Sequence, residues 1–367
     1  MKPKRILHII GRMDRAGAET MLMNLYRVLN KDKYQFDFLY FTNDKCDFDN
    51  EIQSLGGKIY RINKSNIFKR TIAIYNLLKT NKQFHAIHTH TLFNNGLNLL
   101  AMYFAKYKRR IAHSHNTSDT NNNSLFGKIY QLFSKFLINK FATKYVACGI
   151  EASEYLFYSN KQVIQLPNAI DVNKFNDCGK KHKHFLKKEL NLNDECLIIS
   201  QIGRFLTVKN HAFSIKLANI LKEKNIDFHM VFAGDGELKD ELINLSKKNK
   251  VNNNITFLGV RNDIPKILAG SDVMIMPSLY EGFPVVLVES QSVGVPAFVS
   301  TNVSSEVDLK VDKIFFYSLN NIDHWANTII NIKNIDTSIN DKERVSIISN
   351  KGFNIEKSVE ILEKIYF

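Results

Sequence analysis

Two acidic side chains, Glu281 and Glu289, are separated by seven residues in the segment YEGFPVVLVES. Such a pair could act as general acid and base, clamp a polar ligand, or simply be solvated. A fully helical segment would place them about 12 Å apart along its axis. Paired carboxylates of glycoside hydrolases need only about 6.5–9.5 Å. The spacing therefore favours two separate contacts with one extended ligand, such as the neighbouring hydroxyls of a ribose.

Backbone and cationic groups near these acids suit a phosphorylated ligand. Gly282 and Phe283 precede a predicted helix, where free N–H groups attract a phosphate or a sugar hydroxyl. Upstream, the segment GRFLTVKNH carries Arg204 and Lys209 after a predicted strand. An arginine fork and a lysine point charge together suit a diphosphate, although two solvated loop bases remain the alternative.

The first half of the chain offers a glycine and several histidines. Gly17 lies in the turn before a predicted helix, where small residues let backbone N–H groups approach a phosphate. The turn lacks a GxGxxG pattern, and a purely structural role remains open. His88, His90, His113 and His115 come in pairs at the ends of two predicted strands. A metal site is conceivable there, but we interpret His115 as a ligand contact and His90 and His113 as packed residues.

The elements that must position these side chains alternate between strand and helix, twice over. This pattern predicts two doubly wound α/β domains with parallel sheets, and a ligand at the carboxyl ends of the strands in a cleft between them. We expect domains over residues 1–172 and 173–352, and a final helix over 353–367 that packs back toward the first domain. The polar stretch Asn173–Asn193 shows no apolar period, and its start is predicted to be a connection.

Composition and charge narrow the functional class. The chain has 367 residues, 44% hydrophobic and 23% charged, which is ordinary for a globular protein. No apolar run reaches the roughly eighteen residues of a membrane-spanning helix, and the N-terminal run is too short for a signal peptide. The four cysteines lack CxxC spacing, so we expect neither disulfides nor zinc. Residues 1–172 hold 25 basic and 12 acidic side chains, a net charge of +13 out of +14, which favours an anionic partner.

The order of the motifs adds a resemblance. The segments GRFLTVKNH, VFAGDGEL, FLGVRNDIP, PSLYEGFPVVLVES and VGVPAFVST follow one another at family-like intervals. The chain resembles the retaining GT-B glycosyltransferases, and within them the fourth family, in particular those bacterial members that build capsular and exopolysaccharides. The resemblance implies two Rossmann-like domains facing a central cleft, a nucleotide-sugar substrate with UDP expected, no cofactor and no metal.

The resemblance also implies site residues. Glu281 would contact the donor sugar and Glu289 the ribose, while Arg204 and Lys209 would neutralise the diphosphate. His115 resembles the histidine near the reacting carbon, so the implied catalytic set is His115, Arg204, Lys209 and Glu281. The implied donor contacts add Gly17 near the diphosphate, Val260 and Arg261 beside the base, and the amides of Gly282 and Phe283. The family usually has two glycines before the acid of the N-terminal loop, whereas this chain reads Ala16-Gly17-Ala18-Glu19.

The basic first half would then be the acceptor domain. Leu125–Tyr145 interleaves apolar residues with lysines, and such a stretch could lie on an anionic membrane or form a core-facing helix with a basic edge. The first alternative fits a lipid-diphosphate-linked glycan acceptor and a cytoplasmic protein held at the inner face of the cell membrane. A nucleotide-sugar epimerase on a similar frame is the main competing function. The interpretation as a nucleic-acid-binding protein depends on the net charge alone, because the sequence shows no nucleic-acid recognition motif.

Overall fold

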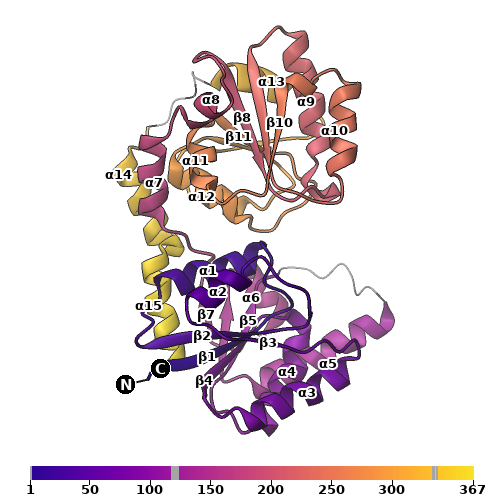
Figure 1. Ribbon diagram of the computed structural model, residues 1–367, viewed down its shortest axis with the longest axis vertical. Coiled ribbons are helices and arrows are strands. Elements are labelled where there is room, and N and C mark those ends of the chain that lie inside the picture. The colour runs from indigo at the N-terminus through magenta and orange to yellow at the C-terminus, as the bar shows by residue number, and fades with distance from the viewer. Residues whose placement is uncertain (1, 117–123, 333–334, 336–337) are drawn as a thin grey trace. The chain divides into compact units, whose positions relative to one another are not determined.

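The chain folds into two compact units, each built on one parallel sheet (Figure 1). The structure is a computed structural model that describes residues 2–116, 124–332, 335 and 338–367. Unit 1 comprises residues 1–170 with 355–367, and unit 2 comprises residues 171–354. The sequence placed these boundaries at 172/173 and 352/353, within two residues of where the structure divides the chain.

Unit 1 contains a seven-stranded sheet in the order β3-β2-β1-β4-β5-β6-β7, with every pair parallel. The strand β2 is buried at all seven positions, as expected for a strand covered by helices on both faces. Its one acid, Asp37, is fully buried and is held by the guanidinium of Arg5. The strands are β1 (Lys4–Ile9), β2 (Tyr34–Tyr40), β3 (Ile59–Arg61), β4 (Phe84–Thr89), β5 (Arg110–Ser114), β6 (Lys144–Ala147) and β7 (Val163–Gln165).

The helices of unit 1 include the C-terminal one. The predicted final helix is confirmed as α15 (Ile355–Tyr366), and it lies beside β1 and β2 in Figure 1. Its apolar stripe, which includes Leu362 and the fully buried Tyr366, joins the core under these strands. The other helices are α1 (Gly17–Val28), α2 (Asp49–Ser54), α3 (Ile67–Thr80), α4 (Asn95–Phe104), α5 (Leu125–Phe141) and α6 (Ile150–Leu156).

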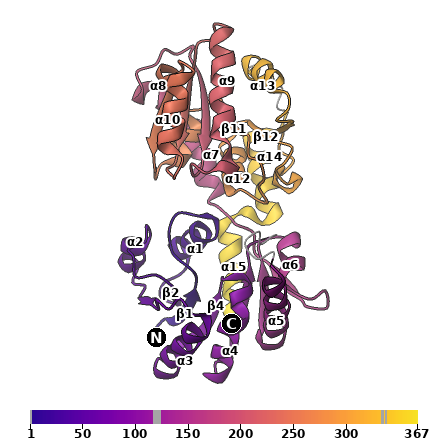
Figure 2. The same ribbon diagram turned by 90° about the vertical axis from the view of Figure 1, so that its right-hand side faces the viewer.

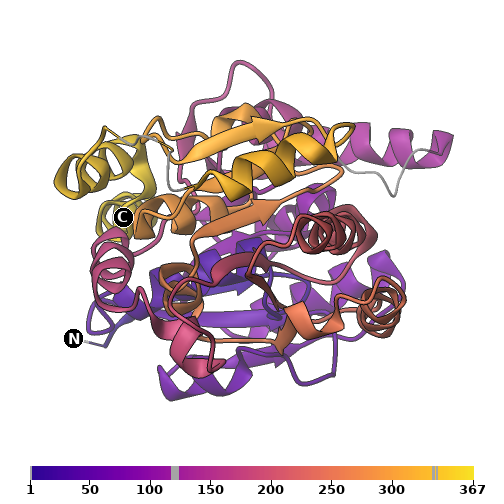
Figure 3. The same cartoon turned by 90° about the horizontal axis from the view of Figure 1, so that it is seen from above.

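Unit 2 repeats the same architecture with six parallel strands in the order β10-β9-β8-β11-β12-β13. One layer of helices contains α9, α10 and α13, and the other contains α7, α8, α11 and α12 (Figures 2 and 3). The strands are β8 (Leu197–Ile202), β9 (Phe228–Ala233), β10 (Ile255–Gly259), β11 (Val273–Met276), β12 (Ala297–Ser300) and β13 (Ile314–Tyr317). The helices are α7 (Val172–Lys181), α8 (Phe185–Glu189), α9 (His211–Glu223), α10 (Lys239–Lys248), α11 (Ile264–Ala269), α12 (Val285–Val293), α13 (Ile322–Ile330) and α14 (Asp341–Ile348).

The connection predicted at the start of Asn173–Asn193 is wrong, because α7 already begins at Val172, and α8 follows within the same stretch. The face of α7 that packs on its own unit carries few large apolar side chains and includes the buried Asn176 and Gly179. A Cβ atom on Gly179 would come within 2.3 Å of the Val293 carbonyl oxygen in α12. This close helix contact uses a glycine where most amphipathic helices have a large apolar side chain, and the low apolar content of the segment hid the helix from the sequence pattern.

The strand order places the ligand-binding edge of each unit. In both sheets the order reverses beside the first strand, between β1 and β4 in unit 1 and between β8 and β11 in unit 2. Loops that leave the two strands at such a switch point diverge, and ligands of doubly wound sheets bind there, outside the carboxyl ends. The predicted α/β class with two Rossmann-like parallel sheets is confirmed, and the candidate residues can be located against these edges.

Candidate functional site

Two loops meet at the switch point of unit 2. The loop after β8 ends in a short helix at Lys209, whose ammonium forms an ion pair with the Glu281 carboxylate from the loop after β11. These side chains are 20% and 17% exposed, respectively. The next residue, Asn210, donates from its side-chain amide to the Pro277 carbonyl oxygen at 3.0 Å. The structure therefore brings together two of the predicted site residues, 72 positions apart in the chain, and fixes the loops that carry them.

Glycines allow the strand ends around these loops to approach one another. Gly203 and Gly234 have φ angles of +153° and +156°, and a Cβ on Gly234 would lie 2.0 Å from the Gly203 carbonyl oxygen. The Gly234 N–H donates to the Gly259 carbonyl oxygen at 2.9 Å, which ties the end of β9 to that of β10. Arg204 follows Gly203 directly and is exposed. Its guanidinium forms no ion pair with any described residue, so the cation is available to a ligand.

The segment between Glu281 and α12 presents backbone donors. The Gly282 and Phe283 N–H groups have no hydrogen-bond partner among the residues that the structure describes. The helix itself begins at Val285, with Pro284 as its N-cap residue, so these N–H groups lie just before the first turn. The ring of Phe283 stacks on Phe353 at 5.3 Å, which holds the segment against its own unit. Such fixed, unpaired N–H groups suit an anion or a hydroxyl oxygen.

Glu289 is the most perturbed acid of this region. It lies in α12, is largely enclosed by protein, and its carboxylate has no hydrogen-bond or ion-pair partner among the described residues. Burial disfavours the charged form and raises the pKa of Glu289 to about 7. A desolvated carboxylate without a partner costs stability, and such groups concentrate at functional sites.

The two residues predicted beside the base differ in their environment. Val260 is 58% exposed. Arg261 forms a double ion pair, with Glu189 at 2.7 and 3.2 Å and with Asp263 at 2.7 Å twice. These bonds use four of the five guanidinium N–H donors and raise the pKa of Arg261 further. The structure thus assigns this guanidinium mainly to linking α8 with the start of α11, which leaves chiefly its backbone for a ligand.

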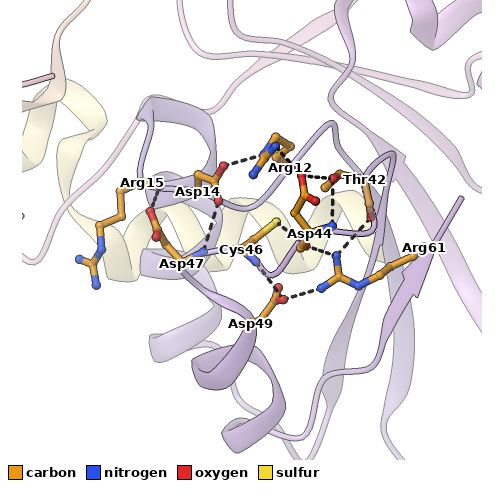
Figure 4. A network of polar contacts seen from close by, with 9 residues as sticks. All are labelled: Arg12, Asp14, Arg15, Thr42, Asp44, Cys46, Asp47, Asp49 and Arg61. Atoms are coloured by element: carbon orange, nitrogen blue, oxygen red, sulfur yellow. Dashed lines mark hydrogen bonds and ion pairs between the residues drawn. The ribbon is translucent and has the colours of Figure 1, made fainter. Parts of the chain in front are cut away.

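In unit 1, the loop before Gly17 is held by a polar network (Figure 4). Arg12 binds Asp14 at 2.7 Å and Asp44 at 3.2 Å, and the Arg15 N–H donates to Asp47 at 3.0 Å. Gly17 begins α1 and has no atom within 4 Å of where a Cβ would lie. The space around this glycine would therefore admit a side chain, and the network rather than the glycine holds the loop.

The histidines of unit 1 form one buried cluster. His115 Nε2 lies 2.9 Å from His90 Nδ1, and His90 Nε2 lies 3.0 Å from His8 Nδ1. His88 Nδ1 contacts the Tyr366 hydroxyl at 2.9 Å. Burial lowers the pKa of every imidazole in the cluster, so the rings are neutral at pH 7. Sequence reasoning found the two pairs but missed His8 and Tyr366, whose neighbours in sequence carry no sign of a site.

Comparison with known proteins decides the family. Residues 15–174 match the model of Glycosyltransferase Family 4, and residues 182–351 match that of Glycosyl transferases group 1. The chain is 40% identical over 334 residues to a Bacillus subtilis (strain 168) protein assigned provisionally as the glycosyltransferase EpsF, covering 89% of this chain and 87% of that protein. The protein belongs to glycosyltransferase family 4. This confirms the predicted resemblance and favours the transferase over the epimerase and nucleic-acid-binding alternatives.

Other relatives of this glycosyltransferase carry more specific names. It is 29% identical to the Escherichia coli UDP-Gal:alpha-D-GlcNAc-diphosphoundecaprenol alpha-1,3-galactosyltransferase, covering 81% of this chain and 79% of that one. It is 26% identical to the capsular polysaccharide biosynthesis glycosyltransferase CapH of Staphylococcus aureus, covering 99% and 98%. Among solved structures, Anabaena HepE in complex with UDP aligns with a TM-score of 0.77 at 17% identity, covering 99% of both chains. The structural likeness, together with the two sheets, shows the GT-B fold.

Proposed function

We propose that this glycosyltransferase transfers a sugar from a nucleoside diphosphate sugar, with UDP as the expected nucleotide, to a lipid-diphosphate-linked glycan in bacterial capsule or exopolysaccharide synthesis. The transfer retains the anomeric configuration and uses no catalytic metal. The observation that carries the proposal is the Lys209–Glu281 pair at the switch point of unit 2. Arg204 lies in the same loop as Lys209, and its guanidinium has no ion-pair partner among the described residues. The names of the Escherichia coli and Staphylococcus aureus relatives support the donor, the acceptor and the pathway class.

The two cations would stabilise the leaving group. As the bond between the sugar and the diphosphate breaks, negative charge grows on a phosphate oxygen, and fixed cations nearby lower the barrier. The Lys209 ammonium has three N–H donors, so it can remain paired with Glu281 while it donates to a phosphate oxygen. The Arg204 guanidinium, which has no ion-pair partner among the described residues, can donate two parallel hydrogen bonds to the same diphosphate. The ion pair therefore positions the lysine before the donor arrives.

The acids and backbone donors would hold the two ends of the donor. Glu281 accepts hydrogen bonds from sugar hydroxyls, and Glu289, which lacks a partner, accepts from the hydroxyls of the ribose. The Gly282 and Phe283 N–H groups bind the sugar or the β-phosphate. His115 is proposed to contact the donor sugar near the reacting carbon, as the family resemblance implies.

Neither glutamate need act as a base on this proposal. The acceptor hydroxyl attacks an oxocarbenium-like anomeric carbon from the face that the diphosphate leaves, so the configuration is retained. A leaving phosphate oxygen takes the proton of the acceptor hydroxyl. Positioning and charge stabilisation then supply most of the rate enhancement.

A donor screen tests the function. Purified protein is incubated with UDP-, GDP- and ADP-sugars, with and without a polyprenyl-diphosphate glycan, and release of the nucleoside diphosphate is measured. We expect fast release from a UDP-sugar only when the acceptor is present. An epimerase would release no nucleoside diphosphate from any donor, with or without acceptor, and that result would refute the proposal.

A charge variant tests the roles of the residues. Arg204→Ala should lower kcat by about 100-fold or more, as loss of an oxyanion-stabilising group does, with little change in acceptor binding. Lys248→Ala, an exposed lysine in α10, is the control and should behave as the parent. Equal losses of turnover and acceptor affinity in Arg204→Ala would contradict the assignment.

A membrane-facing surface on α5 fits a lipid-linked acceptor. Only Ser134, Leu137, Ile138 and Asn139 of this helix are buried. Its large apolar side chains repeat at intervals of three and four residues, so they form one exposed stripe. The core-facing alternative for this helix is therefore wrong for most of its apolar residues. The stripe consists of Leu125 (71% exposed), Phe126 (85%), Ile129 (56%), Leu132 (70%), Phe133 (49%) and Phe136 (48%).

We propose that this stripe docks on an anionic bilayer surface. Lys128 and Lys140 are exposed on the same helix, and the Lys140 ammonium lies 5.4 Å from the centre of the Phe136 ring. Basic residues that flank an apolar helical face are typical of helices that lie in the interface of acidic membranes. Among the described residues, no helix has both the length and the apolar character to cross a bilayer.

Vesicle sedimentation tests the docking. The full chain should pellet with phosphatidylglycerol vesicles and not with phosphatidylcholine vesicles. Phe126→Ser combined with Leu132→Ser should abolish pelleting, whereas Val28→Ser, an exposed apolar residue of α1, should not. Equal pelleting with neutral vesicles, or an unchanged double variant, would refute the docking surface.

A further inference from the structure

The histidine cluster of unit 1 contains several buried ring nitrogens that have no hydrogen-bond partner among the described residues. Its rings line the carboxyl ends of β1, β4 and β5, the central strands in Figure 1. Both ring nitrogens of His113, Nε2 of His88 and Nδ1 of His115 are buried without a hydrogen-bond partner among the described residues. A buried polar atom without a hydrogen-bond partner destabilises the folded chain. A packing role alone does not explain why such groups are gathered at a ligand-binding edge.

Three of these imidazoles converge on one point. Each of His90, His113 and His115 offers a nitrogen, and the three nitrogens lie within 4.8 Å of one another. The rings of His113 and His115 stack at 3.9 Å, and that of His90 lies 5.1 Å from His113. We propose that His90, His113 and His115 form a binding site for a divalent late first-row transition metal, with Zn²⁺ as the representative ion.

The geometry needs a modest adjustment. Zinc–imidazole bonds of about 2.0–2.1 Å in a tetrahedron place two ligand nitrogens about 3.3 Å apart. His90 Nδ1 and His115 Nε2 now lie 2.9 Å apart, so a metal that replaces their shared proton would separate them by about 0.4 Å. His113 can turn toward the ion without losing a hydrogen bond, because it has none to a described residue.

The second triad of the cluster is a poorer site. His8, His88 and His90 also have nitrogens within 4.8 Å, but all three are buried. Tyr366 already occupies two of their nitrogens, at 2.9 Å from His88 and 3.4 Å from His8. His115 is the one partly exposed histidine of the cluster, so the first triad includes a less enclosed ligand than the second.

The donor set selects the class of ion. Imidazole nitrogens suit zinc, copper, nickel and cobalt, whereas calcium and magnesium require oxygen ligands. Neither triad includes a carboxylate, so the bound ion would keep its positive charge. A fourth position would remain for water or an anion, as in zinc sites with three protein ligands. The ion would also hold the His115 ring away from a donor sugar, a consequence that rests on the proposed function.

Cobalt spectroscopy of the full chain tests the site without an activity assay. Metal-free protein is titrated with Co²⁺ and then with Zn²⁺. We expect the strong visible absorption of four-coordinate Co²⁺, saturation at one ion per chain, and its displacement by Zn²⁺. A weak six-coordinate spectrum, or no binding, would overturn the proposal and leave a metal-free chain of hydrogen-bonded imidazoles.

Variants locate the ion. His113→Asn should lower Co²⁺ affinity at least about tenfold, which is the smallest loss expected even for an outer partner of a metal ligand. His113→Cys should keep four-coordinate binding and add a thiolate-to-cobalt charge-transfer band, which shows that the position ligates and that the fold survives. His229→Asn in unit 2, whose ring binds Thr256, is the control and should change nothing. Unchanged affinity in His113→Asn, or His113→Cys without the new band, would refute the assignment.

Discussion

Glu289 should make the protein less stable as the pH rises through neutrality. Its pKa is about 7 in the folded chain, against 4.5 for an ordinary glutamate. Below pH 4.5 the side chain is neutral in both states, and folding costs nothing extra. Between these values the unfolded chain releases the proton while the folded chain keeps it, so the free energy of unfolding falls with pH. Above about pH 7 the carboxylate is ionised in both states, and the full cost of burying its charge lowers the free energy of unfolding.

The size of the penalty follows from this interval. About 2.5 pH units at about 1.4 kcal/mol each give about 3.5 kcal/mol. The carboxylate retains some solvent contact, which reduces the expected effect to about 2–3 kcal/mol. Glu289→Gln removes the charge and keeps the shape. We therefore expect this variant to match the parent near pH 4.5 and to exceed its stability by about 2–3 kcal/mol at pH 8.

Urea unfolding followed by tryptophan fluorescence measures the difference. The only tryptophan of the chain, Trp325, is fully buried in α13, so it reports on the unit that contains Glu289. Glu241→Gln, an exposed glutamate in α10, is the matched control and should show no such pH dependence. If Glu289→Gln gains no stability between pH 4.5 and 8, the carboxylate is not desolvated in the way argued. The same variant should bind the UDP-sugar more weakly, because the proposal assigns the carboxylate to the ribose.

Three further changes test the packing of the sites. Gly234→Ala should lower the stability of unit 2 by about 2–4 kcal/mol in urea unfolding, because its Cβ would meet a carbonyl oxygen at 2.0 Å. Gly259→Ala is the control: it has open space around it and should cost only about 1 kcal/mol. Similar losses in both variants would contradict the close loop contact. Tyr366→Phe should cost unit 1 about 1–2 kcal/mol by amide hydrogen exchange, since the buried hydroxyl bridges two histidines, and an unchanged exchange rate would argue against that bridge. Lys209→Met and Glu281→Gln should be non-additive by about 1 kcal/mol in a double-mutant cycle of stability, and strict additivity would show that their ion pair contributes nothing.

The fold class could be predicted from the sequence because buried parallel strands and amphipathic helices have different apolar periods. Runs such as those at β1 and β8 and the stripe of α15 were predicted near their observed bounds. The helix α7 was missed because its segment is mostly polar and packs closely at Gly179. The amphipathic period of α5 was visible, but a period does not say which face is buried. Only the neighbouring helix α4 shows that the apolar stripe is left outside.

Within the candidate sites, the sequence determined the chemical groups and their order along the chain. The tertiary structure decided which groups meet. Lys209 pairs with an acid 72 positions away, and Arg261 is committed to Glu189 across the same distance in the other direction. His88 contacts Tyr366 over 278 positions. Pairings of this kind depend on strand order and on backbone contacts at glycines. A local sequence pattern predicts neither of these features. Local periodicity therefore predicts the helices and strands. Long-range packing decides which charged groups pair and which ring nitrogens stay without a partner among the described residues, and the proposed chemistry depends on both.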